Sequence, residues 1–187
     1  MQIVTGTDPD AAFSQATALR DGTPVTIRVM RPDDRERIVA AFNKLEPGTI
    51  YTRFFSYRKE IPASSLDRIS AIDFVHLAGL VATIGEGAEE TIIGGATYVG
   101  IPAPDGAKTA EVAFTIEEDY QGQGLASKLM VALTGLARRH GIVRFVAEVL
   151  SGNAPMLGVF QRCGLPMRRR SEQGVVHVEL DLAAPGN

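Results

Sequence analysis

In residues 111–140, a short strand pattern is followed directly by a glycine turn and then by a long helix pattern. Residues 111–116, Glu-Val-Ala-Phe-Thr-Ile, are rich in β-branched and aromatic side chains and alternate in character, as strands do. Leucines at helical spacing follow over residues 125–140, at Leu125, Leu129, Leu133 and Leu136. The glycine turn, Gln-Gly-Gln-Gly, occupies residues 121–124. A strand that turns directly into an amphipathic helix restricts the chain to folds in which helices pack on a sheet.

The glycine turn has the properties of a phosphate-binding site. A helix start leaves backbone N–H groups free and carries the positive end of the helix dipole. Gly122 and Gly124 leave the backbone bare, so phosphate oxygens can approach it closely. No Lys-Ser or Lys-Thr pair completes a nucleotide-triphosphate loop here, and Ser127 stands where a dinucleotide fingerprint needs its third glycine. The turn therefore predicts pyrophosphate binding, with an ordinary strand-to-helix turn as the alternative.

The remaining patterns place further strands and helices on either side of this unit. Strands are expected at residues 24–30, 74–84, 91–101 and 143–150, and as a final hairpin at residues 168–171 and 175–182. Helices are expected at residues 32–45, 63–71 and 154–162, with Pro47-Gly48 ending the first of them. Residues 1–21 are expected to be a loose lead-in or to form a short helix over residues 11–19. These elements together predict an α/β (α+β) fold with a mixed central sheet.

The composition is that of a soluble globular protein, because 45% of the 187 residues are hydrophobic and 22% are charged. A chain of this length is expected to form one domain. The formal charge of −3 gives no reason to expect nucleic-acid binding, and the basic run at residues 168–170 is interpreted as a solvated strand or turn. Cys163 is the single cysteine and the histidines show no ligand spacing, so neither a disulfide nor a metal site is expected. Without a signal peptide or a membrane-spanning apolar run, a cytoplasmic protein is expected.

Two segments are similar to motifs of the GCN5-related N-acetyltransferases. Residues 121–126, Gln-Gly-Gln-Gly-Leu-Ala, match that family's Gln/Arg-x-x-Gly-x-Gly/Ala motif. A second segment resembles the family's Asn-x-x-Ala-x-x-x-Tyr-x-x-x-Gly-Phe pattern at Asn153, Met156, Phe160, Gly164 and Leu165. The resemblance extends from about Thr23 to Leu182. It implies an acetyltransferase domain over residues 22–183, after the lead-in at residues 1–21 and before a short tail at residues 184–187.

The resemblance implies a mixed, mostly antiparallel central sheet with helices on both faces, whose fourth and fifth strands splay apart to admit the coenzyme. It also implies an N-acetyltransferase that moves an acetyl group from acetyl-CoA to a primary amine. Glu-Val-Ala-Phe at residues 111–114 is similar to the strand that carries the general-base glutamate in the protein-lysine branch. Tyr-Thr-Arg-Phe-Phe at residues 51–55 resembles a segment of acetyltransferase domains found with bacterial acyl-CoA-synthetase-like protein acetyltransferases. A protein lysine is therefore the acceptor that the resemblance favours.

The resemblance also implies roles for individual residues. Glu111 is expected to act as the general base, directly or through water, although a glutamate at a strand start often simply faces solvent. Backbone N–H groups that bind the pantetheine and the thioester oxygen are expected around Phe114, Thr115 and Ile116. The pyrophosphate is expected on the turn residues Gln121, Gly122, Gln123, Gly124, Leu125, Ala126 and Ser127. Asn153 and Phe160 are expected beside the coenzyme, and Asn153 is also a favoured helix N-cap because Ala154-Pro155 follows it.

Phe160 departs from the family pattern. Many members carry a tyrosine there that protonates the leaving thiolate, and phenylalanine has no proton to give. Solvent would then have to supply that proton. Cys163 is expected to be a small buried residue and not a nucleophile. The acids Glu117, Glu118 and Asp119 are expected to shape the turn before the phosphate site.

Three functions are compatible with these observations. The first is acetylation of a protein lysine, and the second is acetylation of a small amine such as a polyamine, an amino acid or an antibiotic. The third is a coenzyme A-binding regulatory module with little turnover. This alternative is retained because Phe160 cannot supply the proton that the leaving thiolate needs. The loops expected to contact the acceptor, at residues 45–71 and 168–175, carry no diagnostic motif. The oligomeric state is equally open, and a homodimer is one of the options.

Overall fold

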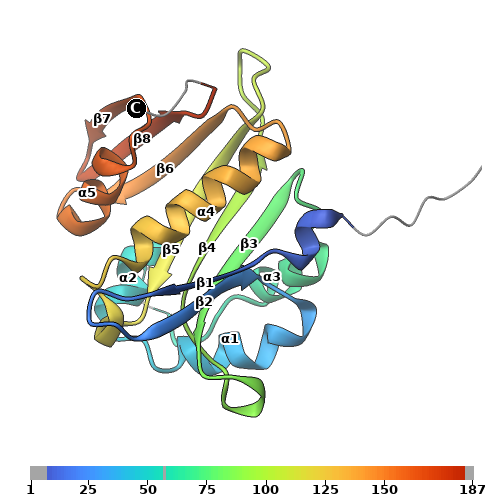
Figure 1. Cartoon of the computed structure of the whole chain (residues 1–187). Helices are drawn as coiled ribbons and strands as arrows, with labels where there is room; N and C mark the ends of the chain where they lie inside the picture. Colours follow the sequence, from blue (N-terminus) through green and yellow to red (C-terminus); the bar gives the residue numbers. More distant parts are fainter. Residues whose placement is uncertain (1–7, 57, 184–187) are drawn as a thin grey trace, which may run out of the picture.

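The computed structural model describes residues 8–56 and 58–183 of the chain (Figure 1). These residues form a sheet of eight strands in the order β1-β2-β3-β4-β5-β6-β8-β7. The strands are β1 (Ser14–Ala18), β2 (Pro24–Val29), β3 (Leu77–Ile84), β4 (Thr91–Ile101), β5 (Thr109–Ile116), β6 (Arg144–Leu150), β7 (Met167–Glu172) and β8 (Val175–Asp181). The helices are α1 (Arg35–Phe42), α2 (Pro47–Phe54), α3 (Ala63–Asp67), α4 (Leu125–Arg139) and α5 (Ala154–Arg162).

The sheet is mixed and mostly antiparallel. Neighbouring strands run antiparallel throughout, except for β5 and β6, which run parallel. Side chains alternate along β5 and so identify its two faces. Ala113 and Thr115 face the side covered by α1, α2 and α3, whereas Phe114 contacts Phe160 of α5 on the other side. Helices therefore cover both faces, and the expected fold class is confirmed.

Helix α4 supplies a large apolar surface on the second face of the sheet. Its four leucines, at positions 125, 129, 133 and 136, are at most 1% exposed, whereas Val131 on the opposite side of the helix is 70% exposed. Their spacing of three or four residues places them on one helix face. Burying one such side chain contributes about 1.5–3 kcal/mol. Because α4 begins at the glycine turn, its packing also sets the position of that turn on the sheet.

The N-terminal segment differs from the expected loose lead-in or helix. Residues Ser14–Ala18 form the edge strand β1, in which Ser14 lies opposite Arg28 and Ala18 lies opposite Pro24 of β2. A helix of this length is marginal on its own, whereas the sheet offers a ladder of backbone partners. The expectation of a helix over residues 11–19 was therefore wrong. The strand precedes residue 22 and belongs to the same sheet as the rest of the chain.

Two element boundaries also differ from the sequence-based prediction. Helix α1 ends at Phe42, and Pro47 begins α2, where proline suits the first helical turn. Strand β3 begins at Leu77 and not at residue 74, because the Asp73 carboxylate accepts the N–H groups of residues 75, 76 and 77 and bends the chain. The other expected strands and helices are present with small shifts at their ends. No helix in the described part of the chain is long and apolar enough to cross a membrane.

Candidate active site

Strands β5 and β6 diverge after a short paired stretch. They are in register only at Thr109–Glu111 and Arg144–Val146. Beyond this point β5 stays paired with β4 as far as Ile116, and β6 stays paired with β8 as far as Leu150. The two strands therefore form the sides of a wedge, with residues 112–116 on the β5 side. An unpaired strand edge of this kind offers N–H and C=O groups that have no partner in the sheet. These are the fourth and fifth of the expected strands, since β1 was not among them, and their splay is as the resemblance implied.

The glycine turn follows at the end of β5, before the first turn of α4. Gly122 and Gly124 have φ angles of 71° and 85°, a backbone conformation in which other residues are strained. The first helical hydrogen bond runs from the Lys128 N–H to the Gly124 carbonyl over 3.3 Å, so the N–H groups of residues 125–127 have no acceptor within the helix. A side chain at Gly122 would meet nothing within 4 Å. The turn is therefore an open cradle of backbone donors that fits a pyrophosphate.

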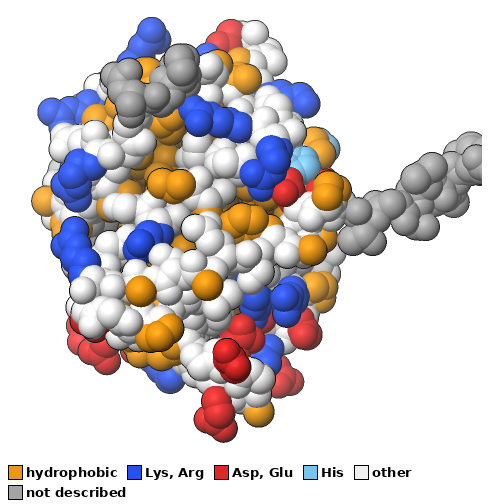
Figure 2. Space-filling model, in the orientation of Figure 1, with side chains coloured by type: hydrophobic (Ala, Val, Ile, Leu, Met, Phe, Trp, Pro, Cys, Tyr) orange, Lys and Arg blue, Asp and Glu red, His pale blue; other side chains and the backbone are white. Residues whose placement is uncertain are grey.

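The surface around the start of α4 favours a polyanion. Figure 2 shows Lys and Arg side chains over the first turns of α4 and near α5, and acidic side chains gathered at the lower end of the same face. Positive charge near the cradle adds to the field of the helix dipole at the same place. The charge distribution of this face is thus complementary to the phosphate end of a coenzyme.

Gln121 links the cradle to two other elements. Its side-chain Nε2 donates to the Ile116 carbonyl over 3.0 Å and to Thr49 Oγ1 over 3.2 Å. Its backbone N–H donates to the Glu118 carbonyl over 3.1 Å. The side chain therefore ties the end of β5 to α2 and holds the turn in place. The Glu118 carboxylate in turn accepts the Glu46 N–H over 2.9 Å, a second contact between this region and the start of α2.

Arg20 is a residue of the cradle that the sequence did not indicate. It lies in the turn between β1 and β2, which Figure 1 shows beside the start of α4. Its Nη1 donates to the Gly122 carbonyl over 3.0 Å, and its backbone N–H donates to the Gln123 carbonyl over 3.2 Å. Its Nε lies 3.8 Å from the position that a Cβ at Gly124 would take. A single arginine about a hundred residues away carries no local signal, and only the pairing of β1 with β2 brings it here.

Replacing Arg20 with glutamine is expected to weaken acetyl-CoA binding about tenfold, the loss of one charge-assisted hydrogen bond of about 1.5 kcal/mol. The turn would lose the donor to Gly122 and the phosphates would lose a neighbouring positive charge. Calorimetric titration with acetyl-CoA measures the change in Kd. Arg168→Gln removes an exposed charge on β7 and serves as the control. An unchanged Kd in Arg20→Gln would exclude Arg20 from the coenzyme site.

Glu111 lies where β6 leaves β5. It is opposite Val99 of β4 and Val146 of β6, and its side chain is exposed. It faces the same side of the sheet as Thr115, and both residues line one pocket. The exposure agrees with a glutamate that faces solvent, and the position at the pocket also agrees with a base that an incoming amine can reach.

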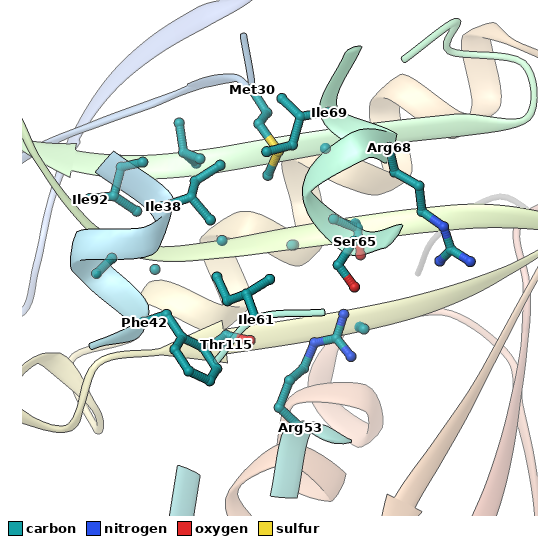
Figure 3. A pocket seen from close by; sticks show the side chains of 18 of the residues that line it. Met30, Ile38, Phe42, Arg53, Ile61, Ser65, Arg68, Ile69, Ile92 and Thr115 are labelled. Carbon is teal, nitrogen blue, oxygen red and sulfur yellow. The ribbon is translucent and has the colours of Figure 1, made fainter. Parts of the chain in front are cut away.

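The pocket has a volume of about 500 Å³ and lies between β3, β4 and β5 and the helices α1, α2 and α3. Most of its lining is apolar, and Figure 3 shows the side chains of Met30, Ile38, Phe42, Ile61, Ile69 and Ile92 directed into it. Concave apolar pockets with a few polar groups are typical small-molecule sites. The pocket therefore offers space for a substrate on the opposite face of β5 from α5.

Four charged residues line this apolar pocket: Arg53, Arg68, Glu111 and Glu117. Burial lowers the pKa of the Arg53 guanidinium, the charge of Glu111 opposes that shift, and the charge of Arg68 adds to it. Burial, followed by the neighbouring charge of Asp119, raises the pKa of the Glu117 carboxyl. The sequence analysis named Arg53 only as part of the segment at residues 51–55 and did not name Arg68 as a site residue. Their proximity depends on how α2 and α3 fold over the sheet.

Two of the residues that were expected beside the coenzyme belong to helix α5 or to its N-cap. The Asn153 side chain accepts the Met156 N–H over 3.2 Å and so caps the helix, as its sequence context predicted. Phe160 is 1% exposed, and its ring meets that of Phe114 edge-on at 5.9 Å between centroids. The half-buried Cys163 thiol donates to the Phe160 carbonyl over 3.0 Å. The phenyl ring of Phe160 thus packs in the core.

A group of possible metal ligands lies at the other end of α4 from the cradle. Asp8, Asp10 and His140 bring one ligand atom each within 4.8 Å of one another. Asp10 already pairs with Arg139 over 2.9 Å and with His140 Nε2 over 2.9 Å. These contacts fasten the N-terminal segment to the end of α4, and the group has no part in the site on β5.

Known proteins match both the sequence and the fold. The model of the acetyltransferase (GNAT) family matches residues 49–165. An acetyltransferase from Pseudomonas aeruginosa is 35% identical over 139 residues, which cover 74% of this chain and 73% of that protein. Acetyltransferase Pat from Mycolicibacterium smegmatis is 36% identical over 88% of this chain, which spans 47% of that protein. The crystal structure of the GNAT domain of S. lividans PAT superposes with a TM-score of 0.80 at 36% identity, covering 90% of this chain and 96% of that one.

Proposed function

The chain belongs to the acetyltransferase (GNAT) family, and from this premise we propose that it acetylates the side-chain amine of a protein lysine with Glu111 as the general base. The family membership makes it an acetyl-CoA-dependent N-acetyltransferase. The lysine acceptor is supported by the likeness to the two Pat proteins. The observation that carries the proposal is the layout of β5, where Glu111 marks the divergence from β6 and the cradle follows the same strand.

The proposed reaction uses three parts of this layout. The cradle at residues 121–127 binds the pyrophosphate, and the edge of β5 at residues 114–116 binds the pantetheine and the thioester oxygen through backbone N–H groups. The amine enters from the pocket side and loses its proton to the Glu111 carboxylate, directly or through water. The neutral amine nitrogen then attacks the thioester carbonyl carbon, so that a C–N bond forms and the C–S bond breaks, and the nitrogen passes its second proton to water as the amide forms.

The leaving thiolate needs a proton, and Phe160 has none to give. In the proposed reaction that proton comes from water that enters through the wedge between β5 and β6. A coenzyme A thiolate is a tolerable leaving group, so turnover does not require a side-chain acid at this position. A reducing compartment such as the cytoplasm agrees with the free thiol of Cys163, and we place the reaction there.

Incubation with acetyl-CoA and lysine-containing proteins is expected to add acetyl groups to lysine side chains, detected by mass spectrometry. Calorimetry should first show that acetyl-CoA binds, and heat-denatured protein is the control for chemical acetylation. Acetylation of free polyamines or amino acids alone would replace the lysine acceptor with a small amine. Binding without turnover on any amine would indicate a regulatory coenzyme A module, and no binding at millimolar acetyl-CoA would reject the coenzyme site itself.

A further inference from the structure

We propose that Arg53 and Arg68 form a carboxylate-binding subsite in the acceptor pocket, so that the accepted amine is one with a carboxylate close to it. The inference rests on the proposed transfer to an amine and specifies what the acceptor carries. Two sources present this chemistry: an acidic residue next to a lysine in a protein, and the carboxylate of a free amino acid.

The two arginines come from different elements and reach the same pocket. Arg53 lies in the last turn of α2, and Arg68 begins the short 3₁₀ turn that follows α3. Both line the pocket together with Glu111. Figure 3 shows the two guanidinium groups on the same side of the pocket, near Ser65, with the apolar side chains on the other side. The pocket thus has an apolar part and a cationic part.

Neither guanidinium forms a close ion pair with a carboxylate in the described part of the chain, although Glu111 lies within range of the charge on Arg53. Arg53 stacks on the Phe54 ring at 4.8 Å. Its burial disfavours its charged form, the charge of Glu111 favours it, and the nearby charge of Arg68 disfavours it. Other arginines of the fold behave differently, since Arg28, Arg35 and Arg144 each pair with an aspartate. A further anion bound beside Arg53 and Arg68 would offset the burial of Arg53 and the repulsion between the two charges. A carboxylate is the anion that suits this position, because the two oxygens of a carboxylate match the N–H groups of a guanidinium.

The position of Glu111 indicates which molecule brings the carboxylate. Glu111 offers a negative charge to an ammonium group in the same pocket, within range of the charge on Arg53. An acceptor that has both an ammonium and a carboxylate group is then complementary to the pocket at both ends. The apolar lining around Met30 and Ile69 suits the aliphatic part of the same molecule. The phosphates of the coenzyme bind at the cradle, so they do not compete for the two arginines.

The binding test uses isocaproate and its uncharged amide, which share an aliphatic body and differ in the carboxylate. Calorimetric titration of the acetyl-CoA-saturated protein is expected to show isocaproate binding about tenfold more tightly than the amide, as one charge-assisted bidentate contact would give. Arg53→Gln and Arg68→Gln should each reduce this preference. Arg169→Gln is the matched control, because Arg169 is an exposed arginine of β7 that does not line the pocket. Arg68 is exposed, so its substitution tests the subsite even if Arg53→Gln fails to fold.

Equal binding of isocaproate and its amide by the wild-type protein would overturn the proposal. So would a preference that survives in both pocket variants. Neither result depends on turnover, so the subsite is tested even if the proposed acetyl transfer is wrong. A complete absence of turnover on every amine would count against the acetyl transfer alone.

Acceptor assays then identify the source of the carboxylate. A lysine peptide with a neighbouring aspartate is compared with its asparagine counterpart, and leucine is compared with leucinamide. A preference for the aspartate peptide that Arg68→Gln abolishes supports an acidic protein segment as the source. A preference for leucine that the same variant abolishes supports a free amino acid. If turnover proceeds equally on all four acceptors, the subsite has no role in acceptor choice and the proposal fails.

Discussion

Glu111→Gln is expected to lower kcat by about 10²- to 10⁴-fold, the usual contribution of a general base. Glutamine has nearly the same shape but cannot take the proton from the acceptor's ammonium group, which must become a neutral amine before it attacks. The cradle lies at the far end of β5 and its donors belong to the backbone, so the Kd for acetyl-CoA should stay nearly unchanged. The two effects together would separate a role in chemistry from a role in coenzyme binding.

Steady-state kinetics at saturating acetyl-CoA and calorimetric titration measure these two quantities. Glu86→Gln makes the same chemical change at an exposed residue between β3 and β4 that does not line the pocket, and it serves as the control. The pH profile gives a further check, because the loss of a base should remove the rise of kcat with pH on its acidic side. Unaltered turnover in Glu111→Gln would assign the proton to another acceptor, such as bulk water.

Asp34→Ala is expected to lower the free energy of unfolding by about 3–5 kcal/mol, because it removes the fully buried partner of a buried arginine and leaves that side of the guanidinium without an acceptor. Arg28 is 3% exposed and Asp34 is 0% exposed, and two hydrogen bonds of 2.7 Å join them. The Asp34 carboxylate also accepts the Arg31 N–H over 2.8 Å, and Glu90 pairs with the other side of Arg28 over 2.9 Å. This cluster fastens β2 to the start of α1 and to the β3–β4 connection, which together support the wall of the acceptor pocket.

Denaturant unfolding measures this loss, and Asp67→Ala is the matched control. Asp67 pairs with Arg35 over 3.3 Å at the surface, where such a pair contributes about 1 kcal/mol or less. A similar loss for both variants would contradict the special role of the buried pair. The pH dependence is a second readout. Burial of Asp34 would raise its pKa, but Arg28 and the Arg31 N–H lower it below the ordinary value of 3.8. The stabilisation is therefore present above about pH 4 and is lost as the pH falls through the lowered pKa.

The part of the site that follows one stretch of chain was predictable from that stretch. The leucine spacing predicted α4, and the positive φ of Gly122 and Gly124 is a conformation that glycine adopts without strain. Both depend on interactions between near neighbours along the chain. The same holds for Asn153, whose side chain caps the helix that begins directly after it.

Other features were not predictable because their partners are distant in sequence. Residues 14–18 carry no strong strand pattern and become β1 through pairing with β2. Arg20 reaches Gly122 across 102 positions of sequence only because that pairing folds the turn back onto α4. The acceptor pocket has the same origin, since Arg53, Arg68 and Glu111 meet only when α2 and α3 cover the sheet.

The chain alone therefore determined the cradle, the helix behind it and the strand that carries Glu111, because turn and helix formation depend on local backbone preferences. It also determined the family, through motifs that lie within those local elements. The tertiary structure decided where β5 and β6 part, which arginines lie at the cradle and in the pocket, and what shape the pocket has. Those features arise from burial and pairing between distant segments, whose free energy no short window of sequence contains.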